Sequence, residues 1–316
     1  MALIIQANDG RIAYRDLIDK LMRDGERVAP RGQPTREIRN VIVSIRNPEL
    51  AVPVGTGRKM NMGIGYAEAT QLLGGISCLW QLDQVSANRF NRFATGDRLE
   101  GAYGPKISSR MIDVLNCLYT DSDTRQAYAT IFRDELPNAD VPCTIGFGFS
   151  IRDGHLSMDV HMRSNDVWLG FPYDVWQFTR LQMVVAYVLG VPLGPYTHYV
   201  NSMHLYERNY ETAERLFNSV IVPASQPLAL VNFVEYMTPA TFNSVYQRWR
   251  YVSNIARLTL SGAHFDVPDD FINGINEVQA HVPPWPLDYT LCGHCGYVLP
   301  PREFDDVYTS RCKRCG

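Results

Sequence analysis

The sequence lacks an excess of one charge, a long apolar run and a recognisable N-terminal leader, and each absence argues against a class of function. With a net charge of -3, the chain has no overall electrostatic attraction to nucleic acid or to an anionic membrane. No run of about 18 apolar residues, the length needed to span a bilayer, occurs. The opening MALIIQANDGR has neither the basic segment nor the apolar core of a signal peptide. We therefore expect a cytoplasmic protein without membrane contacts and without direct nucleic-acid binding by its main domain.

The sequence also lacks the cysteine distribution of a secreted, disulfide-stabilised protein. Of its seven cysteines, Cys78, Cys117 and Cys143 are scattered, and the other four are paired near the end. This distribution favours a reducing compartment. With 316 residues, of which 46% are hydrophobic, the chain can bury one large core or two small ones.

Four segments have helical patterns. Residues 12–24 carry apolar side chains at helical spacing, and Gly25 follows as a stop signal. Residues 66–75 and 107–118 have related patterns. The run at 178–190 is apolar on nearly all sides, which predicts a buried central helix.

Strand patterns occur between these helices. The alternation at 40–46 predicts a strand, preceded by a polar loop at 26–40. Residues 142–164 contain two alternating runs joined by Asp153-Gly154, a dipeptide that favours a tight hairpin turn. Helices and strands alternate without an internal repeat, so the predicted fold class is α+β.

A composition shift near the C-terminus predicts a domain boundary. Three prolines in HVPPWPLDYT, residues 281–290, favour a stiff, non-helical linker. We expect a main domain at 1–280, this linker, and a small module at 291–316.

The C-terminal module contains two Cys-x-x-Cys pairs separated by 16 residues. Four thiolates can converge from two turns on a tetrahedral site, so the spacing predicts a structural zinc ion in a ribbon-like module. The alternative is a redox-active or accidental thiol pair. So short a module cannot bury a core, and metal binding would supply most of its folding free energy. The expected zinc ligands are Cys292, Cys295, Cys312 and Cys315.

Four short motifs in the main domain occur in a characteristic order. They are PC at 142–143, MRSND at 162–166, LGFPYD at 169–174 and HLY at 204–206. Together they resemble the thymidylate synthase family, with similarity from about residue 11 to 210. The resemblance implies a mixed sheet with helices on one face, and a homodimer with shared active sites. It also implies a nucleoside monophosphate substrate and 5,10-methylenetetrahydrofolate as cofactor.

The resemblance assigns catalytic roles to four residues. Cys143 matches the nucleophile that adds to C6 of the pyrimidine and makes C5 reactive toward a one-carbon unit. Glu68 matches the glutamate that organises water and proton transfer around the base. Asp166 matches an aspartate on the proton-transfer and folate side, and Tyr103 matches the tyrosine of a GPVYGK-type motif. Outside this context, Cys143 is read as a small buried apolar residue and Glu68 as a helix-surface acid.

The resemblance also assigns substrate and cofactor ligands. A phosphate dianion needs several guanidinium and hydroxyl donors in one place, whereas a single arginine is as readily a solvated surface charge. The matched phosphate ligands are Arg31, Arg163, Ser164 and, from the neighbouring subunit, Arg125. The matched sugar ligands are His204 and Tyr206. The matched folate-pocket residues are Leu169, Gly170 and Tyr173.

Three positions depart from the family pattern. Thr144 replaces the histidine that usually follows the nucleophile, and Met162 replaces the glutamine before the Arg-Ser pair. Gln126 replaces the second arginine of the cross-subunit pair, and the usual C-terminal tail that closes over folate is not recognisable. These differences bear on phosphate affinity and on closure over the cofactor.

Asp174 stands where the synthases have an asparagine. An amide both donates and accepts, so it can pair with O4 and N3–H of uracil. A carboxylate only accepts, which suits the cytosine amine and a protonated N3, but it opposes the acceptor O4 of uracil. An unpaired buried acceptor costs about 1–3 kcal/mol, so cytosine is the expected base. The alternative is that Asp174 only caps a helix beginning near Val175.

Relatives with aspartate at this position are deoxycytidylate or cytidylate hydroxymethylases. The resemblance therefore predicts a C5 hydroxymethyltransferase acting on dCMP or CMP. Two alternatives remain: a C5 methyltransferase of the thymidylate synthase type acting on dUMP, UMP or dCMP, and an inactive relative that serves as a binding protein. Turnover of dUMP against dCMP tests the base, and a covalent adduct with a 5-fluorinated nucleotide tests for activity.

Overall fold

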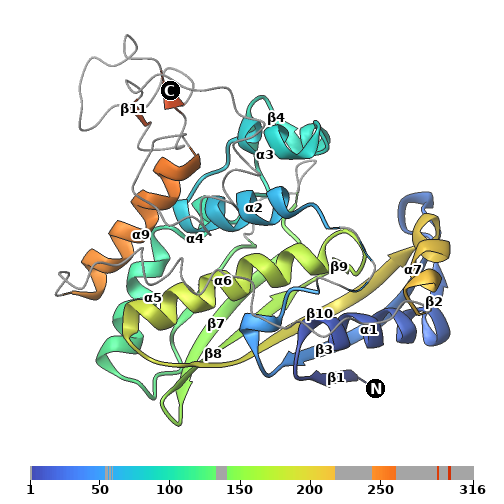
Figure 1. The fold of residues 1–316 in the computed structure, drawn as a ribbon, viewed down its shortest axis with the longest axis horizontal. Coiled ribbons are helices and arrows are strands. Elements are labelled where there is room, and N and C mark those ends of the chain that lie inside the picture. The colour runs from blue at the N-terminus through green and yellow to red at the C-terminus, as the bar shows by residue number, and fades with distance from the viewer. Residues whose placement is uncertain are drawn as a thin grey trace.

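The computed structural model describes residues 2–53, 56, 58, 60–132, 141–217, 244–260, 290–291 and 298–299. Most of them form one mixed sheet with helices packed along it (Figure 1). The sheet order is β1-β3-β10-β8-β7-β6, with β2 paired to β3 and β9 paired to β10. The strands of this sheet are β1 (Leu3–Ala7), β2 (Glu26–Val28), β3 (Thr35–Ile45), β6 (Tyr128–Thr130), β7 (Thr144–Arg152), β8 (His155–Met162), β9 (Asn165–Asp166) and β10 (Leu193–Tyr206). Two smaller pairs are β4 (Ala94–Thr95) with β5 (Arg98–Leu99) and β11 (Thr290–Leu291) with β12 (Val298–Leu299).

The long strand β10 organises the sheet. It runs antiparallel to β3 and parallel to both β8 and β9. Its alternate residues Tyr196, His198 and Val200 are buried in the core. The β7–β8 hairpin turns at Asp153 and Gly154, whose φ angles of 50° and 74° are those of a type I′ turn. This confirms the predicted hairpin.

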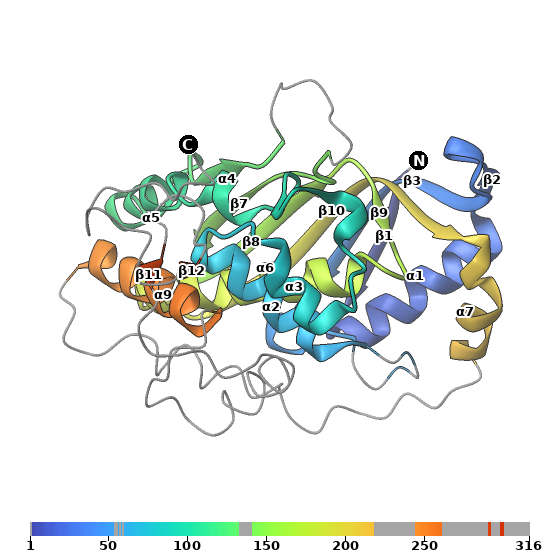
Figure 2. The same cartoon turned by 90° about the horizontal axis from the view of Figure 1, so that it is seen from above.

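The helices are α1 (Gly10–Asp24), α2 (Met62–Gly74), α3 (Leu79–Ser86), α4 (Gly104–Ile107), α5 (Arg110–Thr120), α6 (Phe171–Leu189), α7 (Tyr210–Phe217) and α9 (Val245–Leu260). Figure 2 shows α1, α2, α3 and α6 on the same side of the sheet. α1 contacts β3, and α6 contacts β8 and β10. As predicted, α6 is buried on nearly all sides, and it begins before the apolar run because Pro172 is accommodated in its first turn.

Two sequence predictions need correction. The segment 26–40, expected to be a polar loop, forms β2 and the first part of β3. β2 pairs only with β3, so this is an edge hairpin, where exposed charged side chains are compatible with strand structure. The helix predicted at 107–118 is present as α5, but it begins three residues later than predicted, at Arg110, after the short α4 has ended at Ile107.

The predicted linker and cysteine module lie mostly outside the described residues, which include only β11 and β12 from this part of the chain. The four predicted zinc ligands are not among them, and the boundaries at 280 and 290 stay predictions. In the described ranges, no cluster of three or more histidine, cysteine or acidic side chains is placed to hold a metal ion. No helix there combines the length and hydrophobicity needed to cross a membrane.

Candidate active site

Asp174 lies in the first turn of α6 with only 8% of its surface exposed. Each carboxylate oxygen accepts a hydrogen bond from a side-chain amide: Oδ2 from Asn165 Nδ2 at 2.7 Å, and Oδ1 from Gln177 Nε2 at 3.1 Å. Burial raises the pKa of Asp174 to about 7, and the two amide donors act in the opposite direction. The helix begins at Phe171 with Gly170 as its cap residue, so the interpretation of Asp174 as an N-cap is wrong.

Glu68 approaches Asp174 from α2. The two helices pack closely because Gly65 has no side chain, and a Cβ there would lie 2.5 Å from the Trp176 ring on α6. Burial raises the pKa of Glu68 to about 8, and the nearby Asp174 charge adds to this increase. Glu68 Oε2 is buried and accepts no hydrogen bond from the described residues. A carboxyl group that titrates near neutral pH is suited to general acid–base chemistry.

Tyr103 and Cys143 complete this buried end of the site. The Tyr103 hydroxyl lies within electrostatic range of Asp174, Cys143 and Glu68, and burial raises the pKa of Tyr103 well above its usual value. Its ring stacks on Phe178 of α6, with ring centroids 5.8 Å apart. The structure thus brings together four predicted residues that come from four separate segments of the chain.

Arg163 is in direct contact with Cys143, which precedes β7. The Arg163 backbone N–H donates to the Cys143 carbonyl at 2.9 Å, and its guanidinium Nη2 lies 3.7 Å from Cys143 Sγ. The guanidinium also donates to the carbonyls of Val141 and Pro142, at 2.8 and 2.9 Å. A cation beside a sulfur favours the thiolate, which is the nucleophilic form of cysteine.

The predicted sugar ligands meet the Arg-Ser pair where β9 joins β10. Ser164 Oγ and His204 Nδ1 are 3.4 Å apart, and Tyr206 lies edge-on to His204 with ring centroids 5.1 Å apart. The pairing of β9 with β10 positions these side chains, because it sets His204 opposite Asp166. The structure therefore joins these predicted phosphate and sugar ligands into one surface.

The predicted folate residues surround the start of α6. Asp166 Oδ1 accepts backbone N–H groups from the following loop, including that of Leu169 at 3.1 Å. Burial raises the pKa of Asp166, while these hydrogen bonds and the nearby His204 oppose the increase. Leu169 is 42% exposed, Gly170 caps the helix, and Tyr173 Oη accepts the backbone N–H of Asn61 at 2.9 Å.

Arg58 lies beside this loop and was not identified from the sequence. Its guanidinium carbon is 5.4 Å from the Trp168 ring centroid and 5.6 Å from that of Tyr173. Its Nε and Nη1 are buried and have no hydrogen-bond partner among the described residues. A half-buried cation with two buried nitrogens next to two aromatic rings suits an anionic ligand that also has a flat aromatic system.

Arg31 and Arg125 are both exposed and lie on different connections. Arg31 has a positive φ of 52° in the turn Pro30–Gly32 between β2 and β3, and Arg125 belongs to the turn between α5 and β6. Figures 1 and 2 show the two connections at opposite ends of the molecule. One chain therefore does not bring both arginines to one phosphate.

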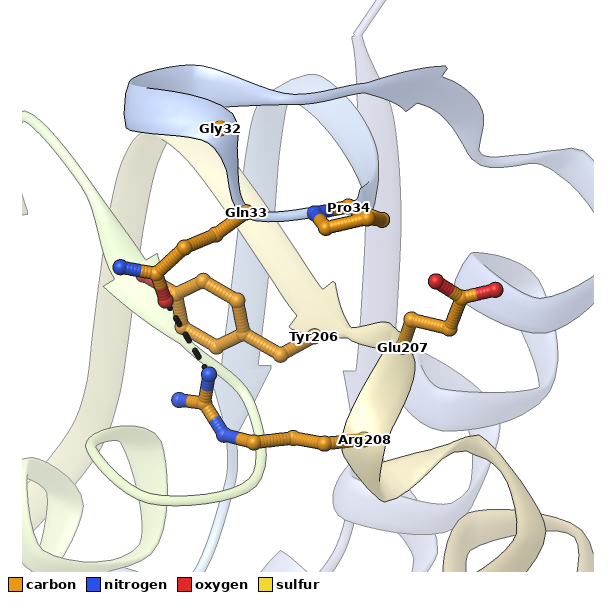
Figure 3. Close-up of a pocket in the computed structure, with 6 residues that line it drawn as sticks. All are labelled: Gly32, Gln33, Pro34, Tyr206, Glu207 and Arg208. Carbon is orange, nitrogen blue, oxygen red and sulfur yellow. Dashed lines mark hydrogen bonds between the residues drawn. The ribbon is translucent and has the colours of Figure 1, made fainter.

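An open cavity of about 380 Å³ lies between the β2–β3 connection and the end of β10 (Figure 3). Arg208 Nη1 donates to Gln33 Oε1 at 3.1 Å, and the Arg208 guanidinium carbon lies 4.0 Å from the Tyr206 ring centroid. The cavity adjoins Tyr206, one of the two predicted sugar ligands. Its lining residues are Gly32, Gln33, Pro34, Tyr206, Glu207 and Arg208.

Comparison of the sequence with known proteins identifies its family. The sequence model described as thymidylate synthase matches residues 12–234. The chain belongs to the thymidylate synthase family. Members of this family use methylenetetrahydrofolate to transfer a one-carbon unit, and they are typically homodimers that act on a nucleoside monophosphate. The match confirms the resemblance read from the short motifs.

Individual relatives in the thymidylate synthase family differ in their named activities. A deoxyuridylate hydroxymethyltransferase from Bacillus phage SP01 is 29% identical over 218 residues, which cover 62% of this chain and 57% of the phage protein. The chain thus spans little more than half of that relative. A protein from Methanocaldococcus jannaschii, provisionally named a thymidylate synthase, is 31% identical over 219 residues, covering 65% of this chain and 91% of its own. A protein from Methanothermobacter thermautotrophicus with the same provisional name is 27% identical over 227 residues, covering 68% and 99%.

Several site residues were missed beside the thymidylate synthase motifs. Gln177 stands three positions after Asp174, a spacing that places two side chains on one helix face, so it could have been found. Asn165 lies inside the RSND motif, and only its hydrogen bond shows that it points toward Asp174. Arg58 and Arg208 had no local signal, because only the three-dimensional fold sets them beside the site.

Proposed function

We propose that this chain is a folate-dependent C5 hydroxymethyltransferase that acts on a cytosine nucleoside monophosphate, dCMP or CMP. The supporting observation is the buried position of Asp174 near Glu68, Tyr103 and Cys143. Each Asp174 oxygen already accepts from an amide, so the ionised group can only accept again from the base. The exocyclic amine of cytosine is a donor, whereas O4 of uracil is not.

In the proposed reaction, the Cys143 thiolate forms a bond to C6 of the pyrimidine, and the electron pair of the C5–C6 double bond becomes available at C5. Methylenetetrahydrofolate, when bound, supplies the one-carbon unit to which C5 bonds. The bond between the one-carbon unit and the carrier nitrogen would then break, with the proton lost from C5 passing to that nitrogen, which would leave an exocyclic methylene on the ring. Glu68 is placed to hold a water molecule and accept its proton as the oxygen adds to this methylene. The thiolate then leaves C6, which restores the ring double bond.

The residues around the start of α6 fit the cofactor. Arg58 presents buried, unpartnered donors beside Trp168 and Tyr173, which suits the carboxylates and the flat rings of a folate. Asp166 is held by backbone N–H groups in the same loop. We expect Arg58, Asp166 and Tyr173, with Leu169 and Gly170, to orient the cofactor.

The named activity of the phage relative favours a second candidate, hydroxymethylation of a uracil nucleotide. A protonated Asp174 has one O–H donor and one acceptor, so it can pair with uracil as well. Incubation of dCMP, CMP, dUMP and UMP with methylenetetrahydrofolate, followed by product mass, separates base, sugar and product. A methyl product would instead support a synthase-type methyltransferase.

The test of the base assignment is Asp174→Asn. We expect the ratio of kcat/KM for the cytosine nucleotide to that for the uracil nucleotide to fall by roughly ten- to a hundredfold, because the amide meets the mixed pattern of uracil. Asp113→Asn, a change at an exposed carboxylate on α5, is the matched control. An unmoved ratio in the Asp174 variant would remove the main support for cytosine.

We propose that the active form is a homodimer with shared sites. Arg31 and Arg125 lie at opposite ends of one chain, so a second copy is needed to bring both to one phosphate. The sheet face opposite the core also carries exposed apolar side chains, with Ile4 60% and Tyr128 45% exposed, and their strand neighbours Ile5 and Ala129 are buried. Such exposed apolar side chains suit a protein interface.

We further propose that residues 291–316 bind one structural zinc ion through the paired cysteines, after a linker at 281–290 and a catalytic domain at 1–280. The support is the Cys-x-x-Cys spacing. Metal analysis should find about one zinc per chain, and a chain truncated near Trp285 should lose it. A metal-free protein with an ordered C-terminus would contradict the proposal.

A further inference from the structure

A buried line of side chains runs from the middle of β10 to the carboxylate of Asp174. Tyr196 Oη lies 2.7 Å from His198 Nδ1, His198 Nε2 lies 3.3 Å from Asn165 Oδ1, and Asn165 Nδ2 lies 2.7 Å from Asp174 Oδ2. Tyr196 and His198 are fully buried, and Asn165 is 3% exposed. None of the first three residues in this line has a role in the reaction described above.

The hydrogen bonds in this line have one direction. Asn165 Oδ1 can only accept, so His198 Nε2 must carry the proton, and Nδ1 then accepts from the Tyr196 hydroxyl. Burial lowers the pKa of His198 to about 3, which keeps the ring neutral, and the two hydrogen bonds select the tautomer. With its oxygen fixed by His198, Asn165 must turn its NH₂ group toward Asp174. All three donors therefore point toward the carboxylate, and successive bonds of this kind strengthen one another.

The packing around Asn165 holds this orientation. A Cβ at Gly170 would lie 3.0 Å from Asn165 Nδ2 and 3.3 Å from Asp174 Oδ2, so glycine leaves just enough room for the pair. The Phe171 ring packs edge-on against His198, with ring centroids 5.3 Å apart.

The ionisable groups near Asp174 come from several elements. Glu68 on α2, Tyr103 before α4 and Tyr196 on β10 each lie within its electrostatic range. A negative charge on any of these groups would oppose ionisation of Asp174. Its amide partners are therefore the groups that favour the carboxylate form.

We propose that Asn165, oriented by His198 and Tyr196, is a positioning residue for base selection that holds Asp174 as a pure hydrogen-bond acceptor toward the substrate. The inference rests on the proposed function, in which Asp174 reads the base. Without the Asn165 donor, Asp174 keeps its proton to higher pH. A carboxylic acid can donate as well as accept, so the uracil nucleotide becomes a substrate and selectivity falls.

The experiment compares the ratio of kcat/KM for cytosine and uracil nucleotides in a series of variants of the full chain. Asn165→Leu, a change of similar shape that removes both polar atoms, should lower the ratio about tenfold. His198→Leu frees the amide to rotate and should lower it less, whereas His198→Gln can supply an N–H at the Nε2 position and should keep it. Gln182→Met is the control, because Gln182 is a fully buried amide on α6 that donates to the carbonyls of Leu156 and Gly194 instead.

Titration of the aspartate carboxyl carbons by ¹³C NMR in the unliganded protein provides a second measurement that does not depend on turnover. Asn165→Leu and His198→Leu should raise the pKa of Asp174, and Gln182→Met should not. If Asp174→Asn moves the selectivity ratio but Asn165→Leu does not, the inference fails and the proposed function stands. If Asp174→Asn has no effect, the proposed function fails, and an unchanged Asp174 pKa in Asn165→Leu would overturn the hydrogen-bond line as well.

Discussion

The base end and the phosphate end of this site are built in different ways. At the base end, Asp174 is buried in the first turn of α6, and both of its oxygens are held by side-chain amides. At the phosphate end, Arg31, Arg125 and Arg163 are exposed, and two of them lie on separate connections. The first end is formed by the core of a single chain, whereas in the proposed dimer the second would be completed by a ligand and a partner. Base selectivity would therefore be set by the fold of one chain, whereas phosphate affinity would depend on the ligand and on the partner chain.

The largest effect should come from the nucleophile, which stands between the two ends. Cys143→Ala should lower turnover by more than about a thousandfold, because it removes the proposed thiolate that forms the bond to C6. Nucleotide binding should change little, since base and phosphate contacts remain. Calorimetry of nucleotide binding and steady-state rates measure the two quantities, and near-normal turnover would contradict the mechanism.

The next largest effect tests whether the phosphate end needs two chains. Arg125→Ala and Cys143→Ala subunits should each be nearly inactive alone. In a mixed dimer, one of the two sites receives both an intact Cys143 and an intact Arg125 from the partner, so activity should return. Tagged heterodimers purified before assay provide the measurement, and no recovery in verified heterodimers would count against shared sites.

A third variant, with a smaller expected effect, separates nucleotide affinity from base selectivity. Arg163→Gln should raise KM by about tenfold and also lower kcat for cytosine and uracil nucleotides alike, because it removes a proposed phosphate donor and the cation beside Cys143, neither of which reads the base. The ratio of kcat/KM between the two nucleotides should stay constant. Arg23→Ala, at an exposed position of α1, is the control. A selectivity change in the Arg163 variant would show that the two ends are not independent.

The smallest effect concerns the pH dependence of stability at the base end. The pKa of Glu68 is about 8 in the folded protein, so the folded state binds more protons than the unfolded state above about pH 4.5. Stability contributed by this group is present at low pH and is lost as pH rises toward 8. Glu68→Gln should therefore unfold about 2–4 °C higher than the parent at pH 8 and show no such gain near pH 4.

The control for this prediction is Glu100→Gln, which removes an exposed carboxyl and should leave the pH dependence unchanged. Asp174 also has a raised pKa, so part of the slope should persist in the Glu68 variant. Thermal unfolding between pH 4 and pH 8 measures the difference.

Some helices and strands could be predicted from their local sequence, and others could not. The β7–β8 hairpin was predictable because Asp153-Gly154 by itself specifies a tight turn. The core of α6 was predictable because an apolar run of that length has no place at the surface. The edge hairpin at 26–40 was not, since its polar side chains carry no strand pattern and its pairing with β3 is set by tertiary structure.

In the candidate site, too, some features could be predicted from the sequence and others could not. The resemblance found Cys143, Glu68 and Asp174 as separate residues, but their convergence depends on the close packing of α2 on α6 at Gly65. His198 could not be found, because it reaches Asn165 only through the neighbouring positions of β9 and β10 in the sheet. Long-range pairing of this kind leaves no local trace in the sequence.

The run from Arg163 to Asp174 is one short, continuous piece of chain that links the proposed phosphate ligand Arg163 to the proposed base ligand Asp174. An exchange of that stretch alone would carry Asp174 and Asn165, one of its two amide partners, into a related enzyme, whereas Gln177 lies outside the stretch and Arg163 contacts the segment that holds Cys143. Recipients would not be equivalent, however. The transferred Asn165 would be oriented only in an enzyme whose sheet has a histidine at the position of His198. The sheet of the recipient enzyme, rather than the transferred segment, therefore decides whether the exchange works.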